Sequence, residues 1–403
     1  MASCTVLILD NLAQTLAVVR SLGAAGYRVI LGCDGGKPEA GSSRFCQETW
    51  VHPSMQDVQE FGESLSALLK KRSDIQWIFP IAEVSIRLML RLSELIPQNV
   101  QVAMVPQRQF LACTDKHQSN MIANCAGIRY PESRVVSNLR DLSAARDAIG
   151  CPVIVKSDKT VDRVFGRKAY IVRTEAEFNA VFQHWPVEHD TLMVQKYIVG
   201  AVEGCDFVAR SGTLVAYSEA LTVRTDMLDG TGYGVEFLST APSEDLVADT
   251  KAFVRAYDYS GPGIIQFVRE EATGKLFFLE NNPRLSAGVA GTIGCGIDLP
   301  VLALQSLDTK LDLTLEEFFA EGKPYKFGWY THWLSRDIEG YVNQRQELSR
   351  VERQNWLWNM FRSFRRANGH VMWQWKDPLP RIWIYLRFGV RVFWRLILPK
   401  RHE

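Results

Sequence analysis

The 403-residue chain lacks several features that would assign it to a common class of protein. Its eight cysteines include no C-x-x-C pair, and a chain of this length needs no disulfide framework, so we interpret them as buried or free thiols in a reducing cytoplasm. No run of about 18 uncharged apolar residues is present, which disfavours a membrane-spanning helix. The N-terminus has no basic segment followed by a long apolar one, so we expect no signal peptide.

The chain also lacks an excess charge of either sign. Lysine and arginine total 46 against 45 aspartates and glutamates, so the net charge of +1 gives no field that favours nucleic acid, and we expect no nucleic-acid partner. Residues Asp10 to Gln14 read DNLAQ and lack G-x-G-x-x-G, which disfavours a dinucleotide dehydrogenase although Asp34 follows the second expected strand. Apolar residues make up 47% of the chain, which is typical of a soluble globular protein of two or three domains.

Strand and helix patterns alternate through the first part of the chain. Apolar runs predict three strands, and segments with apolar residues at helical spacing predict three helices. The strands are TVLILD, YRVILGCD and QWIFPIA, and the helices are Ala13 to Leu22, FGESLSALLKK and SIRLMLRLSELI. This alternation predicts a doubly wound parallel α/β domain over residues 1–112.

Two regions of different character follow. Residues 113–310 are expected to form an α+β domain, with a helix from Lys116 to Ala126 and strands in PVIVK, AYIVR, LMVQKYI, TLVAYSEAL, GIIQFVRE and KLFFLENN. Residues 311–403 are expected to form a helical, basic and aromatic tail. From residue 350 onward this tail holds six of the 11 tryptophans, and twelve lysines or arginines against three acids.

The strongest motif is GIIQFVREEATGKLFFLENNPRLSAG, residues 263–288. An antiparallel hairpin centred on Thr273 places Gln266 opposite Glu280, and period-two alternation puts Asn282 on the same face. Three oxygen donors on one patch suit a divalent cation that is shared with nucleotide phosphates. From spacing alone, an ordinary hairpin with a solvated acid remains the alternative. Arg284 follows with a charge suited to a phosphoryl group.

The string L-E-x-N-P-R, with a glutamine on the partner strand, resembles the signature of the ATP-grasp superfamily, in particular the carbamoyl-phosphate-synthase-like carboxylate–amine ligases. The resemblance implies a pre-ATP-grasp domain followed by a two-lobed ATP-grasp domain. It also implies that Gln266, Glu280 and Asn282 bind magnesium or manganese, and that Arg284 stabilises the transferred phosphoryl group.

Upstream segments resemble further ATP-grasp motifs in the expected order. TDKHQSNMIANCAGIRYPES is similar to the entry of the domain, which implies that Lys116 reaches the nucleotide phosphates. IGCPVIVKSDK is similar to G-x-P-V-I-V-K-P, which gives Lys156 a phosphate and adenine-side contact. A solvated surface lysine is a poor alternative for Lys156, since it ends an apolar strand where a charge needs a partner.

The segment LMVQKYIVG resembles the hinge that hydrogen-bonds adenine through backbone atoms, with a plain strand as the alternative. The resemblance assigns Gln195, Lys196, Tyr197 and Ile198 to this hinge and Glu203 to a ribose contact. It also places Arg224 and Gly234 where family members contact substrate or phosphate. In this assignment Arg224 is a second catalytic side chain, in addition to Arg284.

One segment departs from the family pattern. The loop after Lys156 reads SDKTVDRVFGRKAY and contains only Gly166, whereas the family has a glycine-rich loop whose N–H groups cover the phosphates. Arg163, Arg167 and Lys168 offer side-chain donors instead. The departure leaves open an atypical or weakened enzyme.

The resemblance implies an ADP-forming ligase with ATP and Mg²⁺ (or Mn²⁺) as cofactors and with small-molecule carboxylate and amine substrates. A degenerate ATP-binding regulatory protein and a membrane-associated factor are the alternatives, and a homodimer is left open. As a helix, residues 379–398 place four arginines opposite an apolar face, which suits an anionic membrane surface, and packing back on the body is the alternative. We therefore expect a cytoplasmic protein, with peripheral attachment to the inner face of the membrane under the first alternative.

Overall fold

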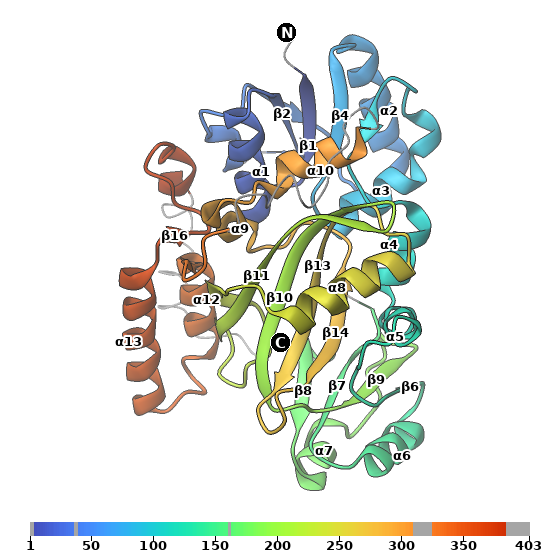
Figure 1. Ribbon diagram of the computed structural model, residues 1–403, viewed down its shortest axis with the longest axis vertical. Helices are drawn as coiled ribbons and strands as arrows, with labels where there is room; N and C mark the ends of the chain where they lie inside the picture. Colours follow the sequence, from blue (N-terminus) through green and yellow to red (C-terminus); the bar gives the residue numbers. More distant parts are fainter. Residues whose placement is uncertain (1–3, 36–38, 160–162, 309–324, 384–403) are drawn as a thin grey trace.

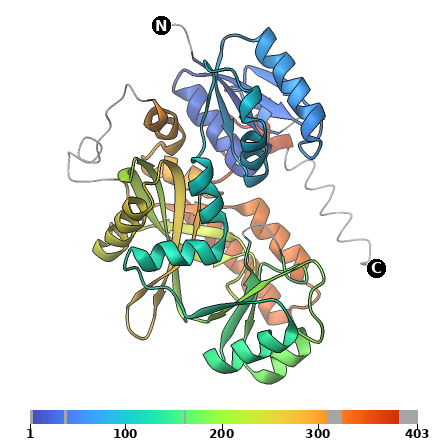
Figure 2. The same cartoon turned by 90° about the vertical axis from the view of Figure 1, so that its right-hand side faces the viewer.

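The computed structural model describes residues 4–35, 39–159, 163–308 and 325–383 (Figure 1). Three sheets are arranged along its long axis. The first domain lies at one end, a small antiparallel sheet lies at the other, and the largest sheet lies between them (Figures 1 and 2). The ligand-sized cavity described below opens between the small sheet and the large one.

The first domain contains a parallel sheet in the order β3-β2-β1-β4-β5. Its strands are β1 (Thr5–Leu9), β2 (Arg28–Cys33), β3 (Glu48–Val51), β4 (Ile75–Pro80) and β5 (Gln101–Val102). Val6 and Ile8 face the core under α1 (Ala13–Ala24), while Leu7 and Leu9 face the core under α2 (Val58–Lys71) and α3 (Glu83–Arg91). Helices therefore cover both faces, and the predicted doubly wound arrangement is confirmed.

One predicted helix of this domain is shorter than expected. The segment SIRLMLRLSELI divides into α3, which ends at Arg91, and a separate 3₁₀ turn over Ser93–Leu95. The apolar spacing continues through both pieces, which explains why the pattern suggested a single helix.

The small sheet has the order β6-β9-β7-β8 and is antiparallel. It follows α4 (Gln107–Thr114) and α5 (Lys116–Cys125), and it contains β6 (Ser133–Val136), β7 (Val153–Ser157), β8 (Ala169–Val172) and β9 (Leu192–Lys196). Helices α6 (Leu139–Ile149) and α7 (Glu175–Val181) cover one face, where Val153, Val155 and Val194 are buried. The opposite face, with Ile154 and Lys156, lines the cavity.

The large sheet has the order β14-β13-β10-β11-β12-β15-β16. Its main strands are β10 (Gly200–Arg210), β11 (Thr213–Thr225), β12 (Gly234–Ser239), β13 (Gly261–Glu270) and β14 (Leu276–Asn282). Helix α8 (Glu244–Ala256) packs on the face opposite the cavity, with Phe253 stacked on Phe278. Helices α9 (Val289–Cys295) and α10 (Leu299–Leu307) follow β14 and contact α1 of the first domain.

The described segment after residue 324 contributes strands to the large sheet, which the prediction of a helical tail over residues 311–403 did not include. Strand β15 (Tyr330–His332) pairs with β12, and β16 (Gly369–His370) pairs with β15, so both strands extend the large sheet. Helices α12 (Leu334–Gln344) and α13 (Arg350–Arg366) stand beside them (Figure 1). Some of the basic side chains of this segment form ion pairs with buried acids of the large sheet. Arg366 Nε, for example, lies 2.5 Å from the Glu236 carboxylate.

The predicted amphipathic helix over residues 379–398 lies mostly outside the described residues, which end at Trp383. The described part packs on the protein. Arg381 is buried over the ring of Trp373, and Asp377 forms a buried ion pair with Arg20 of α1 at 2.8 Å. Among the described residues, no single helix has both the length and the apolar composition to cross a bilayer, and only α9 and α10 taken together, bent by 95°, meet that test.

Candidate nucleotide and metal site

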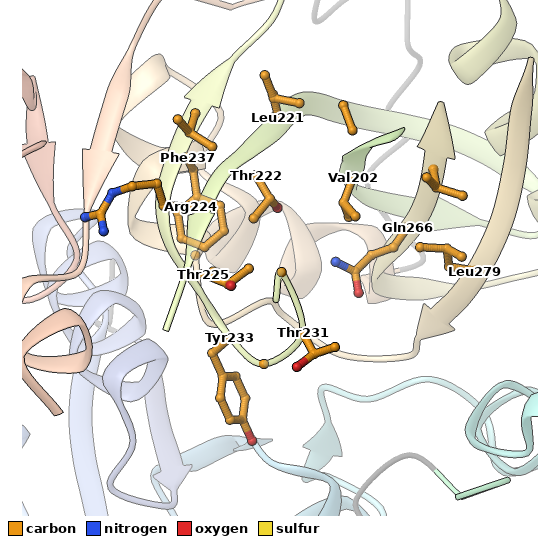
Figure 3. Close-up of a pocket in the computed structure, with 18 of the residues that line it drawn as sticks. Val202, Leu221, Thr222, Arg224, Thr225, Thr231, Tyr233, Phe237, Gln266 and Leu279 are labelled. Atoms are coloured by element: carbon orange, nitrogen blue, oxygen red, sulfur yellow. The ribbon is translucent and has the colours of Figure 1, made fainter. Parts of the chain in front are cut away.

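A cavity of about 1110 Å³ lies between the small and large sheets. Figure 3 shows part of its wall, with Val202, Gln266 and Leu279 on the large sheet. The cavity brings together eleven of the twelve side chains predicted for the site, all except Glu203: Lys116, Lys156, Gln195, Lys196, Tyr197, Ile198, Arg224, Gln266, Glu280, Asn282 and Arg284.

The predicted metal ligands lie on one face of the β13–β14 hairpin. Gln266 pairs with Glu280, as predicted, and Ile264 pairs with Asn282. The register between them is irregular, because a bulge lies beside Gln266 and Phe267 pairs with Phe278. Asn282 Nδ2 donates a hydrogen bond to Glu280 Oε1 at 3.0 Å, which fixes the two oxygen donors side by side.

This donor set contains one carboxylate and two amides. Among the described residues, no group of three histidine, cysteine, aspartate or glutamate side chains is placed to hold a metal ion. Gln266, Glu280 and Asn282 therefore fit a hard cation whose remaining ligands are phosphate and water oxygens, and they do not fit a cation held by protein alone.

Three lysines surround the Glu280 carboxylate. Burial alone would raise the pKa of Glu280, but Lys116 and Lys156, together with the Asn282 hydrogen bond and Lys168, lower it below its usual value. Burial lowers the pKa of Lys156 to about 8, with repulsion from Lys116 acting in the same direction, and burial also lowers the pKa of Lys168 to about 8. Several cations near one anion leave positive charge for a polyanion such as a triphosphate.

The other end of the cavity is a slot lined by the residues predicted for the adenine hinge. The hinge residues Lys196, Tyr197 and Ile198 line it, with the apolar side chains Ile154 and Leu279. The Lys196 N–H donates to Glu132 O at 2.8 Å, and the Tyr197 N–H donates to Pro152 O at 3.1 Å, so these two donors already have partners. Gln195 Oε1 accepts from Lys156 Nζ at 3.0 Å, which positions the lysine between the slot and Glu280.

Comparisons with known proteins bear on the fold of the chain. No protein-family profile matches the chain. The carbamoyl phosphate synthase large chain of Thermotoga neapolitana is 23% identical over 287 residues, which is 68% of this chain and 25% of that protein. The chain thus spans about a quarter of the length of this relative.

Solved structures resemble the whole described architecture. An ADP complex of N5-carboxyaminoimidazole ribonucleotide synthetase superimposes with a TM-score of 0.64 at 14% identity, covering 86% of each chain. The biotin carboxylase domain of Hydrogenobacter thermophilus 2-oxoglutarate carboxylase, with MgADP and bicarbonate, has a TM-score of 0.63 at 15% identity and covers 81% of this chain and 73% of that one. The chain has the ATP-grasp fold.

One predicted contact of the ATP-grasp site is not supported by the structure. On β10, Val202, Gly204 and Asp206 line the cavity, so alternation directs the Glu203 side chain to the opposite face. There Glu203 is held by Arg269, with Nε to Oε1 at 2.8 Å. The prediction that Glu203 contacts the ribose is therefore wrong for this arrangement.

Arg224 borders the ATP-grasp cavity, but its guanidinium belongs to another network. It forms an ion pair with the buried Asp337, lies 3.3 Å from Glu236, and donates to Ser363 Oγ at 3.1 Å. In Figure 3 the side chain points away from Gln266. The guanidinium of Arg224 is thus held by acidic groups outside the row of Gln266, Glu280 and Asn282, and its catalytic role stays a prediction. Gly234 lines the cavity too, but a Cβ there would lie 2.4 Å from the Phe237 ring, so packing alone requires this glycine.

The glycine-poor loop is described from Arg163 onward. Arg163 and Lys168 line the cavity, and Lys168 Nζ lies 3.3 Å from the centre of the Tyr233 ring. Arg167 instead approaches Asp229 at 3.8 Å. Two of the three cations expected in this loop therefore reach the ATP-grasp cavity.

The sequence analysis missed two groups of cavity residues. The first comes from the supposed tail, where α12 and α13 place Trp333, Glu352, Asn355, Trp356 and Asn359 in the wall. The second surrounds Asp206, at the end of the cavity near α9: Ser218, Ser286, Thr292 and Cys295. The sequence carried no local signal for Asp206, because its place on the cavity face depends on the long-range pairing of Gly204 with Gln266.

Proposed function

We propose that this chain is an ATP- and magnesium-dependent ligase that activates a carboxylate as an acyl phosphate for attack by an amine. The observation that carries the proposal is the row of Gln266, Glu280 and Asn282 facing Lys116 and Lys156 in one cavity. The ATP-grasp fold and the nucleotide complexes of its relatives support it. Manganese is the alternative cation, since the same oxygen donors suit either ion.

In the proposed reaction, a carboxylate oxygen of the substrate attacks the γ-phosphorus, and the bond from that phosphorus to the β–γ bridging oxygen breaks to release ADP. The amine nitrogen then attacks the acyl carbon, phosphate leaves, and the nitrogen loses a proton to solvent. Magnesium, when bound, neutralises phosphate charge, and Gln266, Glu280 and Asn282 would hold it. Lys156 and Arg284 orient the phosphates and stabilise charge on the transferred group.

The hinge residues position the base in this proposal. Adenine offers hydrogen-bonding atoms at its edge and two apolar faces. Since the N–H groups of Lys196 and Tyr197 already have partners, the edge contacts come from the hinge carbonyls and the Ile198 N–H, while Ile154 and Leu279 contact the faces of the ring. In this proposal the triphosphate lies toward Glu280, because Lys156 lies between the two regions.

The decisive experiment is ADP release by the full-length protein in the presence of ATP, Mg²⁺ and a panel of carboxylates and amines. We expect substrate-dependent ADP and phosphate, and no AMP, since the relatives hold ADP. Chromatography that finds AMP with pyrophosphate would contradict the acyl-phosphate mechanism.

A catalytically silent ATP-binding protein is the second candidate. The observation that favours it is the loop after Lys156, which has side-chain cations where the family has glycine N–H donors. Calorimetry with ATP and Mg²⁺ separates the two candidates, because the silent protein binds ATP without substrate-dependent ADP release in any member of the panel.

We further propose that the protein attaches to an anionic membrane surface through its C-terminal region. Helix α13 exposes five large apolar residues: Val351, Leu357, Trp358, Phe361 and Phe364, exposed by 43% to 64%. The same helix carries five arginines and a single acid. This composition matches the interfacial helix expected over residues 379–398.

Flotation with anionic vesicles tests this attachment. We expect the full-length protein to float at low salt and to be released as ionic strength rises, because screening weakens the arginine contacts. A variant with Trp358→Ser and Phe361→Ser should float less and remain folded. Sedimentation as a dimer that this variant disrupts, with no flotation, would instead assign the apolar side of α13 to a second copy of the chain.

A further inference from the structure

Asp206 occupies the cavity-facing side of β10, close to the proposed metal site. It pairs with Ile264 of β13, which in turn pairs with Asn282 of β14. Since neighbouring strands lie about 4.8 Å apart, the Cα atoms of Asp206 and Asn282 are separated by about 10 Å. Arg284 follows Asn282 closely in the chain, and its positive charge acts on the Asp206 carboxylate. The two groups therefore present opposite charges in the same part of the cavity.

The Asp206 carboxylate is only partly satisfied by the protein. The residue is 7% exposed, and Thr292 Oγ1 donates to Oδ2 at a long 3.3 Å. Within the described residues, neither Oδ1 nor the buried hydroxyl of Ser286 has a partner in hydrogen-bonding geometry, although this hydroxyl lies near enough to the carboxylate to lower its pKa. Burial raises the pKa of Asp206 to about 6, against the smaller opposing effects of Ser286, Thr292 and Arg284. A buried carboxylate oxygen without a donor is costly and signals a missing partner.

The surroundings of Asp206 indicate what that partner is. Ser218 pairs with Asp206 across β11, and Thr292 and Cys295 approach from α9, so the neighbouring wall is made of small polar groups. The lysines of the cavity gather around Glu280 instead. An acceptor carboxylate among hydroxyl groups suits a group rich in N–H donors, and above all a cationic one.

We propose that Asp206 binds the ammonium group of the substrate whose carboxylate is phosphorylated, so that this substrate is an amino acid. The inference rests on the proposed ligase function and names its substrate class. The substrate carboxylate lies toward Arg284 and the metal-bound phosphates, and its ammonium group lies toward Asp206, with Ser286 as a further contact. A carboxylic acid without an amino group leaves Asp206 unpaired in the closed site, which disfavours its binding.

The competing explanation is structural, since Asp206 also ties α9 to β10 through Thr292. The two explanations differ for a neutral isostere. Asp206→Asn keeps the shape and an acceptor for Thr292 but removes the charge, so it abolishes ammonium recognition and leaves the link to α9. Thr292→Val does the reverse, because it removes the link and keeps the charge.

The test measures ADP release with matched pairs of acids: alanine and propionate, aspartate and succinate, glutamate and glutarate. For at least one pair, we expect the amino acid to exceed its partner by more than tenfold in kcat/KM. Asp206→Asn should lower kcat/KM for that amino acid on the order of 100-fold, mainly through KM, because a desolvated charge pair is lost. The kcat/KM of Asp206→Asn for the des-amino acid, and its KM for ATP, should stay within about twofold of the wild-type values. Thr292→Val should retain the amino-acid preference.

Three outcomes would overturn the inference. The wild-type protein could release ADP no faster with amino acids than with their des-amino partners, or Asp206→Asn could lower kcat/KM equally for both acids of a pair. Thr292→Val could also show the same selective loss of kcat/KM for the amino acid as Asp206→Asn. Circular dichroism and thermal melting show that each variant is folded. Binding of ATP with Mg²⁺ is measured separately by calorimetry. Its absence would contradict the proposed function itself, whereas ATP binding with activity only on des-amino acids would contradict the inference alone.

Discussion

The two carboxylates on the cavity floor, Glu280 and Asp206, stand in opposite electrostatic surroundings. Glu280 is close to three lysines, and their charges bring its pKa below the usual value despite burial. Asp206 is close to hydroxyl groups and one arginine, and burial raises its pKa to about 6. The difference teaches that one part of the cavity has an excess of positive charge around its carboxylate, while the other has a carboxylate that lies mainly among hydroxyl groups.

The largest effect is expected from removing the Glu280 carboxylate. Glu280→Ala should reduce magnesium-dependent ATP turnover by at least about 1,000-fold, because the sole carboxylate of the donor set is lost and three lysines are left without their anion. Coupled ADP assays over a range of Mg²⁺ concentrations measure the effect, and Asn282→Ala should act in the same direction.

Glu271→Ala, at an exposed position near the same hairpin, provides the matched control and should keep full activity. Wild-type turnover in purified, folded Glu280→Ala protein would remove the metal assignment.

The next test concerns the positive side of the nucleotide region. Lys156→Ala should weaken ATP binding by ~1.5–3 kcal/mol, the scale of a lost charge-assisted contact. The pKa of Lys156 is lowered to about 8, so the free protein loses this charge as pH rises through 8, and the bound phosphates restore it.

Wild-type ATP affinity should therefore fall between pH 7 and pH 9, with proton uptake on binding near pH 8. Titration calorimetry in buffers of different ionisation enthalpy measures both quantities. Lys156→Ala should show a smaller proton uptake, with the remainder from Lys168, whose pKa is also lowered to about 8. Unchanged affinity in the variant would argue against the nucleotide position.

Neutralising Asp206 should stabilise the folded protein at alkaline pH. The pKa of Asp206 is raised in the folded protein, so its ionisation opposes folding as pH rises from about 4 through 6. Asp206→Asn should stabilise the protein at pH 8 by up to about 3 kcal/mol, and this gain should disappear below pH 4, where the wild-type carboxyl is protonated in both states. Urea unfolding at the two pH values measures it, and a loss of stability at pH 8 would indicate a structural ion.

The smallest expected effect sharpens the contrast between the two faces of β10. Glu203 is three residues from Asp206 but points away from the cavity toward Arg269. Glu203→Gln should leave the ATP dissociation constant within about twofold and cost at most about 1 kcal/mol of unfolding free energy, because its ion pair is partly exposed. Calorimetry that finds a tenfold loss of ATP affinity would restore Glu203 to the nucleotide contacts.

Local pattern was sufficient for the hairpin of the metal site and insufficient for its neighbours. The turn at Thr273 and period-two alternation placed Gln266 opposite Glu280, although the bulge beside Gln266 had no visible cue. Glu203 was misplaced because the side-chain phase of β10 depends on its pairing with β11 and β13, and this pairing is not local.

The C-terminal segment could not be predicted for a related reason. Strand β15 is only three residues long, and its position depends on β12, which lies more than 90 residues earlier. The acids that bind its arginines are also remote, since Glu236 binds Arg366. Composition revealed the aromatic and basic character of this segment but not that part of it completes a sheet.

The ion pair between Arg20 and Asp377 has a consequence for how the molecule opens. Asp377 also accepts from Ser43 Oγ at 2.7 Å and from the Arg44 N–H at 3.0 Å, so the C-terminal segment is fastened to the first domain at a buried point. Since the same segment extends the large sheet through β15, the first domain and this sheet form one closed frame. The small sheet β6–β9 lies outside that frame, joined to it at the α5–β6 and β9–β10 connections. Any widening of the cavity that leaves this frame intact must therefore come from rotation of the small sheet about those two connections.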